Sequence, residues 1–397
     1  MVDRYKLEIL SPVHIGSGDK WQKDFDYFTD KTGSFLLDKD RFFDSLSDDQ
    51  INEATNSDNI VRFAEAHSID LKPFSKERLS ASRIDTNEIN EYIEDSFETP
   101  YIPGSSIKGA IRTVLANHII HIEELEISYK RGAKKEWAFS AMNKTIFGAD
   151  HHKDFLRGLM VVDCFFKPTD LEVMLSKVYT QNRDGQLMVK QTSRDNPKSQ
   201  MKIYCQCLKQ KASSEITLKI DDNLFEKFSR KLEIKDNRYK ALKDFANIAN
   251  QYAAKKIESE AAFYKDTDLR FLKIFYQNLL KTIKSLKEDS IVLNVGWGSG
   301  WHFKTGDYMA DSQLDDVRMS FDLGKINKRC PANHYGRDLR YDRKKNNFYC
   351  RKCNKEYSPE SVKTLVKPFP KSRKIMFDGH GLARWTPGWI LLTKLDQ

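Results

Sequence analysis

Apolar and polar residues alternate near the start of the chain, where Tyr5-Lys-Leu-Glu-Ile9 predicts a strand with one buried face. The near-continuous apolar run 159–166 predicts a central strand. Similar patterns predict further strands at 34–37, 201–208, 215–220 and 291–295, with two edge-like strands at 368–377 and 387–393. The small polar turn 211–214 predicts that strands 201–208 and 215–220 pair as a hairpin.

A helical period follows Tyr101-Ile-Pro-Gly104. One apolar face is formed by Ile107, Ile111, Leu115, Ile119 and Ile122, and Ser105 or Ser106 could cap its start. Long helical patterns recur between 240 and 287, and another helix ends at Phe147-Gly148. Short helical patterns rich in Asp, Asn and Glu predict a helical insertion over 39–98.

Ser105, Lys108 and Arg112 are three and four residues apart, so they share a second stripe on the predicted helix. A helix N-terminus offers unpaired N–H groups and partial positive charge. Together with the neighbouring Ser106, these groups predict a site for phosphate oxygens. The alternative is an amphipathic helix with a solvated basic face.

The stretch Gly296-Trp-Gly-Ser-Gly-Trp301 directly follows a predicted strand. Glycines at alternate positions let the backbone approach a ligand, and Trp297 and Trp301 offer stacking faces. A Walker loop would end in Gly-Lys-Ser/Thr, and the spacing does not fit a dinucleotide-binding fingerprint either.

His14 lies in the turn Ser11-Pro-Val-His-Ile-Gly-Ser-Gly18, where a histidine is either a packed structural residue or a catalyst. Asp24 and Asp26 alternate with Phe25 and Tyr27, so a strand here would point both carboxylates to one side. Paired carboxylates bind a metal or perform acid–base chemistry, and the alternative is a solvated strand face.

Four residues near the C-terminus have side chains suited to tetrahedral zinc: Cys330, His334, Cys350 and Cys353. The residues between them are basic and polar, so a metal would explain how this segment folds. We expect a structural zinc ion rather than a catalytic one, because no acidic residue adjoins a ligand. Cys205 and Cys207 would share one face of a strand as small core residues.

The composition, with 40% hydrophobic and 12% aromatic residues, predicts a folded protein. A net charge of +9 favours polyanionic partners, nucleic acid before anionic membrane. The polar, basic loop 179–198 could reach over a nucleic acid. Six cysteines in 397 residues do not indicate a disulfide scaffold. No signal peptide and no apolar run of membrane-spanning length are present, so we expect a cytoplasmic protein with no membrane partner.

Several of these stretches together resemble the RAMP superfamily of CRISPR effector subunits. The similar stretches are 11–18, 102–112, 146–148 before 159–163, and 296–300. The size, the helical insertion and the ending from Phe369-Pro-Lys-Ser-Arg373 to Pro387-Gly-Trp389 are most similar to one kind of member. That member caps the 3′ end of the crRNA in the type III-A Csm complex.

The resemblance implies an α+β fold with a ferredoxin-like (RRM-like) β-α-β-β-α-β core and large helical insertions. The zinc-binding insertion at 328–356 is not part of the family pattern and is expected from its own ligand residues. We expect a RAMP core over 1–235 and a second half over 236–397. The family pattern implies that Ser105, Ser106, Lys108 and Arg112 meet the guide's sugar–phosphate backbone. His14 and the loop formed by Gly296, Trp297, Gly298, Ser299 and Gly300 would line the same RNA path.

The resemblance further implies a non-catalytic subunit that binds crRNA and assists its maturation and complex assembly in antiviral defence. Its partners would be backbone RAMP subunits, with target RNA and trimming nucleases as additional candidates. Two alternatives stay open. The first is an endoribonuclease that uses His14, Asp24 or Asp26, as some relatives in the superfamily cleave RNA. The second is a zinc-containing interaction protein for another polyanion.

Overall fold

The computed structural model describes residues 2–57, 59–80, 84–126, 129, 139–182, 186–193, 196, 199–287, 289–303, 317–318, 327–332, 334, 339–342, 345–365, 370 and 372–395. Arg183, Arg194 and Lys198 of the expected basic loop lie outside these residues, as does Phe369. Among the described helices, none is both long and apolar enough to cross a bilayer.

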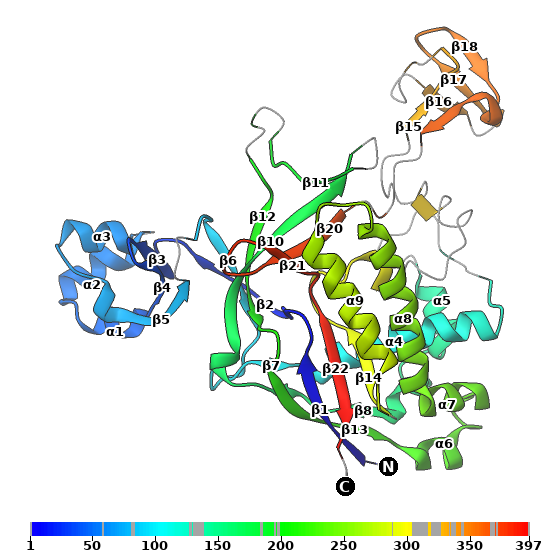
Figure 1. The fold of residues 1–397 in the computed structure, drawn as a ribbon, viewed down its shortest axis with the longest axis horizontal. Helices are drawn as coiled ribbons and strands as arrows, with labels where there is room; N and C mark the ends of the chain where they lie inside the picture. The colour runs from blue at the N-terminus through cyan, green and yellow to red at the C-terminus, as the bar shows by residue number, and fades with distance from the viewer. Residues whose placement is uncertain are drawn as a thin grey trace.

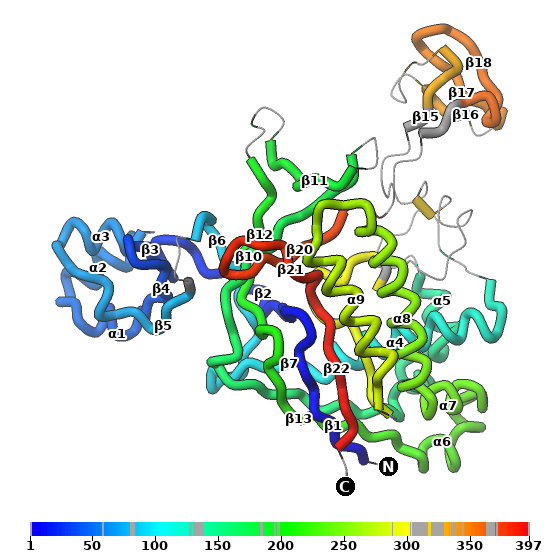
Figure 2. The backbone as a smooth tube through the Cα atoms, viewed as in Figure 1, coloured from blue at the N-terminus to red at the C-terminus, as the bar shows by residue number. Residues whose placement is uncertain are grey.

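A five-stranded antiparallel sheet forms the centre of the molecule (Figure 1). Its order is β14 (Ile291–Asn294), β22 (Trp389–Lys394), β1 (Val2–Ile9), β13 (Ser213–Ile220) and β8 (Leu159–Val161). The predicted first strand is confirmed: Tyr5, Leu7 and Ile9 are buried, whereas Lys6 is exposed. Leu7 pairs with Leu392, which brings the two ends of the chain together (Figure 2).

Helices cover one face of this sheet. Helix α4 (Gly104–Ile122) buries Ile107, Ile111, Leu115 and Ile119, as the period predicted, while Ile122 is exposed. Each of these buried side chains contributes about 1.5–3 kcal/mol relative to exposure. The remaining helices on this side are α5 (Ser140–Phe147), α6 (Asp222–Phe228), α7 (Asp236–Lys243), α8 (Phe245–Tyr264) and α9 (Arg270–Lys284). The chain also forms short 3₁₀ turns: η3 (Phe155–Gly158), η4 (Pro168–Asp170) and η5 (Trp301–Phe303).

A second sheet continues from the first. Its order is β2 (Gly16–Gln22), β6 (Glu88–Tyr92), β12 (Lys202–Leu208), β10 (Leu171–Gln181), β20 (Ser372–Phe377) and β21 (Ala383–Trp385), and β11 (Leu187–Val189) pairs with β10. Three of the connections between the two sheets join consecutive strands: β1 to β2, β12 to β13, and β21 to β22. Nearby, β7 (Tyr101–Ile102) pairs with β9 (Cys164–Phe165) and leads into α4.

Two small modules project from the sheets (Figure 1). The first has its own core around Phe42, Ile60 and Phe63 and contains β3 (Tyr27–Asp30), β4 (Gly33–Leu37), α1 (Lys39–Asp44), α2 (Asp48–Thr55), α3 (Ile60–Ala66), η1 (Lys72–Phe74) and β5 (Ser75–Ser80). The second contains β15 (Asn327–Arg329), β16 (Leu339–Asp342), β17 (Asn347–Cys350), β18 (Lys355–Tyr357), η7 (Pro359–Ser361) and β19 (Lys363–Leu365).

The expected helical insertion 39–98 is helical only in its first part. Strands β5 and β6 follow. Their residues are mostly polar, and Ile89 is the only fully apolar buried residue of β6, so the sequence lacks the apolar–polar alternation by which a strand is predicted. The five-stranded sheet also takes strands from both sides of residue 235, so the expected division there runs through one sheet.

Three predicted strand relationships are wrong. β12 and β13 are consecutive but belong to different sheets, because the chain bends at Ala212, whose carbonyl accepts a 2.9 Å hydrogen bond from the Ile9 amide. The run expected as a central strand is instead the edge strand β8, and its side chains Met160 and Val162 are half exposed. The 387–393 strand, expected at an edge, lies between β14 and β1.

Candidate nucleic-acid interface

The loop after β14 is joined to the His14 turn by main-chain hydrogen bonds. The Trp297 amide donates to the His14 carbonyl at 2.8 Å, and the Gly388 amide donates to the Pro12 carbonyl at 2.9 Å. The Val295 amide in turn donates to the Gly388 carbonyl at 2.7 Å. The structure therefore brings together the two loops that the sequence singled out, at the junction of the two sheets.

Glycine is required at this junction for two reasons. Gly296 and Gly298 adopt φ values of 76° and 94°, which residues other than glycine rarely adopt. A Cβ atom at Gly296 would lie 2.6 Å from the His14 carbonyl oxygen, and one at Gly298 would lie 2.4 Å from Pro387 Cγ. The loop backbone does make a close approach, as predicted, but at Gly296 the neighbour is the His14 turn of the protein itself.

The His14 side chain is only 4% exposed, which corrects the expectation that it lines an RNA path. Its Nδ1 lies 2.7 Å from the Gln206 carbonyl oxygen, and its ring meets Trp297 edge-on at 5.9 Å between centroids. Burial lowers the pKa of His14 against the raising effect of the Gln206 hydrogen bond, and Lys374 lowers it further. The imidazole is therefore a packed, neutral group.

The accessible part of the junction is a face formed by Trp297 and Lys374. The Lys374 Nζ lies 3.8 Å from the centroid of the Trp297 ring, a cation–π contact between two half-buried side chains. Beside this pair is a cavity of about 380 Å³. Its walls include Gly298, Ser299, Gly300, Trp301, Arg373, Lys374, Thr386 and Pro387.

Two polar side chains at this cavity, Arg373 and Ser299, form bonds within the protein. Arg373 forms a buried ion pair with Glu260, with Nη2 and Oε1 2.8 Å apart. The Ser299 hydroxyl donates to the Gly296 carbonyl at 2.8 Å, which stabilises the turn of the loop. The positive charge of Lys374 is thus placed beside an aromatic face and a loop of small residues, a combination that suits a nucleotide.

Helix α4 begins differently from the prediction. Its N-cap is Pro103, without a side-chain capping bond, so neither Ser105 nor Ser106 caps it. The Gly104 amide donates instead to the Asp163 carboxylate at 2.7 Å. The carboxylate occupies part of the helix N-terminus that was expected to face phosphate. The Ser105 side chain is exposed and that of Ser106 is half-buried.

The two cations of the predicted phosphate stripe contact their own chain. Lys108 Nζ donates to the Leu159 carbonyl at 2.7 Å, and burial lowers the pKa of Lys108. Arg112 Nη1 lies 2.6 Å from Asp154 Oδ2, and the guanidinium lies 3.5 Å from the Phe147 ring centroid. These contacts hold α4 against β8 and the turn before it, which corrects the expectation of a free basic stripe.

The start of α4 is nevertheless linked to the His14 turn. The Ile93 amide donates to the Ile15 carbonyl at 2.8 Å, and the Tyr101 amide donates to the Ile93 carbonyl at 3.5 Å. Tyr101 lies in β7, directly before α4. Main-chain hydrogen bonds therefore connect the segment that leads into α4, and so the start of the helix that carries Ser105, to the His14 turn.

The carboxylates considered for catalysis do not form a pair. Residues 24–26 form a turn, and Asp24 has a φ of 64°, so the expected strand does not exist there. Asp26 accepts a hydrogen bond from the Gln22 amide at 2.7 Å and forms an ion pair with Lys39 at 2.6 Å. Both contacts make Asp26 a structural residue of the turn.

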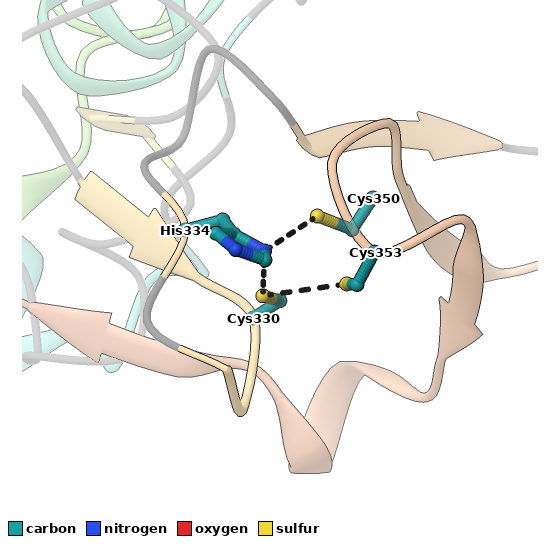
Figure 3. A group of neighbouring side chains, drawn as sticks. All are labelled: Cys330, His334, Cys350 and Cys353. Atoms are coloured by element: carbon teal, nitrogen blue, oxygen red, sulfur yellow. Dashed lines mark hydrogen bonds between the residues drawn. The ribbon is translucent and has the colours of Figure 1, made fainter.

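The four expected zinc ligands converge in the second module (Figure 3). His334 Nδ1 lies 3.4 Å from the Cys330 sulfur and 3.6 Å from the Cys350 sulfur, and the Cys353 and Cys330 sulfurs are 3.8 Å apart. Tetrahedral zinc with Zn–S of about 2.3 Å and Zn–N of about 2.05 Å requires S···N edges of about 3.6 Å and S···S edges of about 3.8 Å. The donor set therefore fits zinc.

The hydroxyl of Tyr357 lies 3.1 Å from the Cys353 sulfur, where it can donate to a thiolate ligand. Few apolar side chains are buried in the described part of this module: Phe348 and Val362 accompany Cys330 and Cys350. A core of so few apolar side chains does not stabilise the fold of a segment this polar by itself, which agrees with a fold that depends on a bound metal ion.

Sequence reasoning missed Lys374 as a residue of the interface. It lies in β20, about eighty residues after Trp297, and the burial pattern of this strand does not alternate, since Arg373 and Lys374 are both half-buried and residues 375–377 are all buried. The only available signal was its place in the stretch Pro-Lys-Ser-Arg-Lys374, which resembles the end of the RAMP pattern.

Comparisons with known proteins show which sequences this chain resembles. The sequence pattern of the RAMP superfamily matches residues 6–304. The CRISPR system Cms protein Csm5 of Methanocaldococcus jannaschii is 27% identical over 323 residues, covering 76% of this chain and 72% of that protein. Csm5 of Streptococcus thermophilus is 29% identical over 137 residues, covering 28% of this chain and 38% of that protein.

Two solved structures share the fold. One is a chain of a type III-A Csm–crRNA–target RNA ternary complex determined by cryo-EM, with a TM-score of 0.61 over 99% of this chain and 100% of that chain. The other is the crystal structure of T. onnurineus Csm5, with a TM-score of 0.52 over 75% of this chain and 90% of that chain. Both are 17% identical in sequence, so they show the fold alone.

Proposed function

Because this chain belongs to the RAMP superfamily, we propose that it is a crRNA-binding subunit of a type III-A CRISPR (Csm) effector complex. In this role it holds the 3′ portion of the guide and assists guide maturation and complex assembly, without cutting RNA itself. The named Csm5 relatives and the likeness to a chain of a crRNA-containing complex support this assignment. Its protein partners are then the backbone subunits of that complex.

The observation that carries the proposal is the Trp297–Lys374 face beside the 380 Å³ cavity. An aromatic ring can stack on any base, and a lysine can meet any phosphate, so neither contact depends on sequence. A subunit that must accept every guide needs such contacts. The glycine-rich loop lets the RNA backbone lie close to the protein, next to Gly298 and Gly300.

The strand order also supports a ferredoxin-like core. Along the chain, β1, α4, β8, β13, α8 and β22 follow one another in β-α-β-β-α-β order, with other elements inserted between them. In the sheet they are arranged β22-β1-β13-β8, and β14 extends the β22 edge. This is the sequence of elements that a ferredoxin-like domain has.

In this proposal α4 has two parts with different tasks. The exposed Ser105 and the adjacent Ser106 contact the sugar–phosphate backbone at the start of the helix. Lys108 and Arg112 act on the RNA indirectly, since their bonds to Leu159 and Asp154 fix the position of the helix.

The absence of cleavage in the proposal rests on the candidate catalytic groups. His14 is buried and hydrogen-bonded to Gln206, and Asp26 is bound to Lys39 and the Gln22 amide. A general acid–base catalyst must reach the proton that it transfers. His14 does not meet this requirement, because it is buried, and the Asp26 carboxylate is held by Lys39 and the Gln22 amide.

We also propose that Cys330, His334, Cys350 and Cys353 hold a structural zinc ion. The match between their separations and the edges of a zinc tetrahedron supports this. The ion would join β17 to the segment after β15 and so hold the second module together.

RNA affinity of purified variants tests the proposed interface. Trp297→Ala should weaken binding of a single-stranded RNA by about 5–100-fold, the range for one stacking contact, with an unchanged salt slope. Lys374→Gln should weaken it several-fold and shallow the slope of log K against log salt by about 0.7–1. Lys31→Ala removes an exposed lysine at the β3–β4 turn of the first module and serves as the control.

Melting temperatures of all three variants should be compared with that of the wild type, so that a folding defect is recognised. Equal RNA affinities and equal salt slopes in the wild type and in folded Trp297 and Lys374 variants would contradict the proposed interface.

A further inference from the structure

A second group of metal-ligating side chains lies beneath the glycine-rich loop. A ring nitrogen of His14 and the sulfurs of Cys205 and Cys207 all lie within 4.8 Å of one another. The two sulfurs are 3.5 Å apart, and all three side chains are almost entirely inaccessible to solvent. We call His14, Cys205 and Cys207 the buried triad.

Strand geometry places the two cysteines. They are two residues apart in β12, so their side chains leave the strand on the same side. His14 approaches the same strand because Val13 and Leu208 exchange main-chain hydrogen bonds of 3.1 and 2.8 Å. Two segments that are distant in sequence from the Cys330 module, the His14 turn and β12, thus create a separate cluster of soft ligands.

The hydrogen bond of His14 prepares its ring for coordination. A carbonyl oxygen only accepts hydrogen bonds, so the 2.7 Å contact with Gln206 assigns the proton to Nδ1. Nε2 then keeps its lone pair. Histidine ligands of metal ions are usually oriented in this way, by a carbonyl or carboxylate that accepts from the other ring nitrogen.

We propose that the buried triad binds one thiophilic d¹⁰ ion, Zn²⁺ or Cu⁺. Two thiolates and one imidazole are the ligands that both ions prefer. The sulfur–sulfur distance of 3.5 Å is close to the edge of about 3.8 Å expected around tetrahedral zinc. The thioether residue Met174, in register with Cys205 on β10, belongs to the same buried cluster.

The position of the ion gives it a structural role at the interface. Trp297 packs against the cluster that contains Cys205 and Cys207, and its ring also meets His14 edge-on. An ion that fixes His14 to β12 would therefore fix the ring on which Lys374 lies. The proposal explains why an imidazole that is closed to RNA occupies the centre of the loop junction, and it does not depend on RNA binding.

Elemental analysis of the full-length chain, expressed in medium supplemented with zinc and copper, tests this inference. The background variant Cys330→Ser/Cys350→Ser/Cys353→Ser removes the sulfur ligands of the second module and leaves the buried triad intact. We expect two ions per wild-type chain and one per background variant, and the analysis identifies the element. Adding Cys205→Ala to the background should remove the remaining ion.

Cys164→Ala is the matched control, because Cys164 is also a fully buried cysteine but lies outside the triad. In the same background it should leave one ion per chain. The cobalt-loaded background variant should in addition show a thiolate-to-cobalt charge-transfer band, a readout that requires no substitution in the triad.

A background variant that folds, carries less than about a tenth of an ion per chain and shows no charge-transfer band would overturn the inference. If the wild type carries one ion that is lost with Cys205→Ala and kept with Cys350→Ser, the triad proposal stands and the zinc proposal for the second module fails. The two proposals are thus separated by the same measurement.

Discussion

The Arg112 guanidinium is bound to Asp154, with Nη1 and Oδ2 2.6 Å apart, on the helix that was expected to present it to phosphate. The same group lies over the ring of Phe147. Both contacts join α4 to the segment that precedes β8. A basic residue at helical spacing can therefore serve the packing of its helix while its neighbour Ser105 stays exposed.

Arg112→Ala should act on stability rather than on RNA affinity. We expect the free energy of unfolding to fall by about 1–2 kcal/mol, because a half-exposed ion pair and one cation–π contact are lost. Chemical denaturation measures this change, and Arg62→Ala, an exposed arginine of α3, is the control. A loss of RNA affinity above about tenfold without a change in stability would contradict the structural role.

Gly296→Ala and Gly300→Ala should differ in their effects. Both positions have positive φ, which costs a non-glycine residue about 1–2 kcal/mol. A Cβ at Gly296 would also meet the His14 carbonyl oxygen at 2.6 Å, whereas at Gly300 the nearest atom is 3.8 Å away. Thermal and denaturant unfolding should show the larger loss for Gly296→Ala, and equal losses would show that the junction is not tightly packed.

Cys350→Ser should release the zinc ion of the second module. Without this ligand the module should open, so protease cleavage within 327–365 should accelerate while the remaining chain stays folded. Zinc content and limited proteolysis measure the two effects, and Cys164→Ala is the control. A variant that keeps its full metal content and its protease resistance would exclude Cys350 as a ligand.

Glu94 should make stability depend on pH. Its pKa is raised from 4.5 to about 7, mainly by burial and also by the nearby carboxylates of Glu91 and Glu98, against the lowering effect of Lys76. Because this pKa is higher in the folded chain, the folded chain binds more protons between pH 4.5 and 7. The stabilising contribution is therefore complete below pH 4.5 and is lost as the pH rises through 7.

Glu94→Gln should remove this dependence. At pH 7.5 the free energy of unfolding of the variant should exceed that of the wild type by about 1–2 kcal/mol, a figure reduced for the solvent screening of a half-buried group. At pH 5 the difference between the two proteins should be smaller. Denaturant unfolding at the two pH values measures it, with the exposed Glu226→Gln as the control. A constant difference at both pH values would exclude a raised pKa as the cause.

The sequence predicted those elements in which periodicity and burial agree. The alternation of β1 and the apolar face of α4 were confirmed, and the motifs around the two loops identified the superfamily correctly. The four candidate ligands of the second module do lie together, as their residue types and spacing predicted, while zinc binding itself stays a prediction. The meeting of His14 with the glycine-rich loop, which the family pattern implied, was confirmed as well.

The remaining features depend on contacts between distant segments. Periodicity does not show that β12 and β13 belong to different sheets. The bend between them, at Ala212, depends on a hydrogen bond with Ile9, a residue far away in the sequence. It also does not show that Asp163 and Asp154 meet α4. The place of Lys374 over Trp297 follows only from the contact between β20 and the loop after β14, which are far apart in sequence.

The central claim is that the Trp297–Lys374 face holds guide RNA. Sequencing the RNA that co-purifies with the tagged chain, from cells that carry a repeat–spacer array and the other subunits, tests it most directly. We predict RNA of uniform 5′ ends and stepped 3′ lengths, with a much lower yield for the Trp297→Ala/Lys374→Gln variant. RNA without repeat-derived sequence, or an unchanged yield from a folded double variant, would contradict the account.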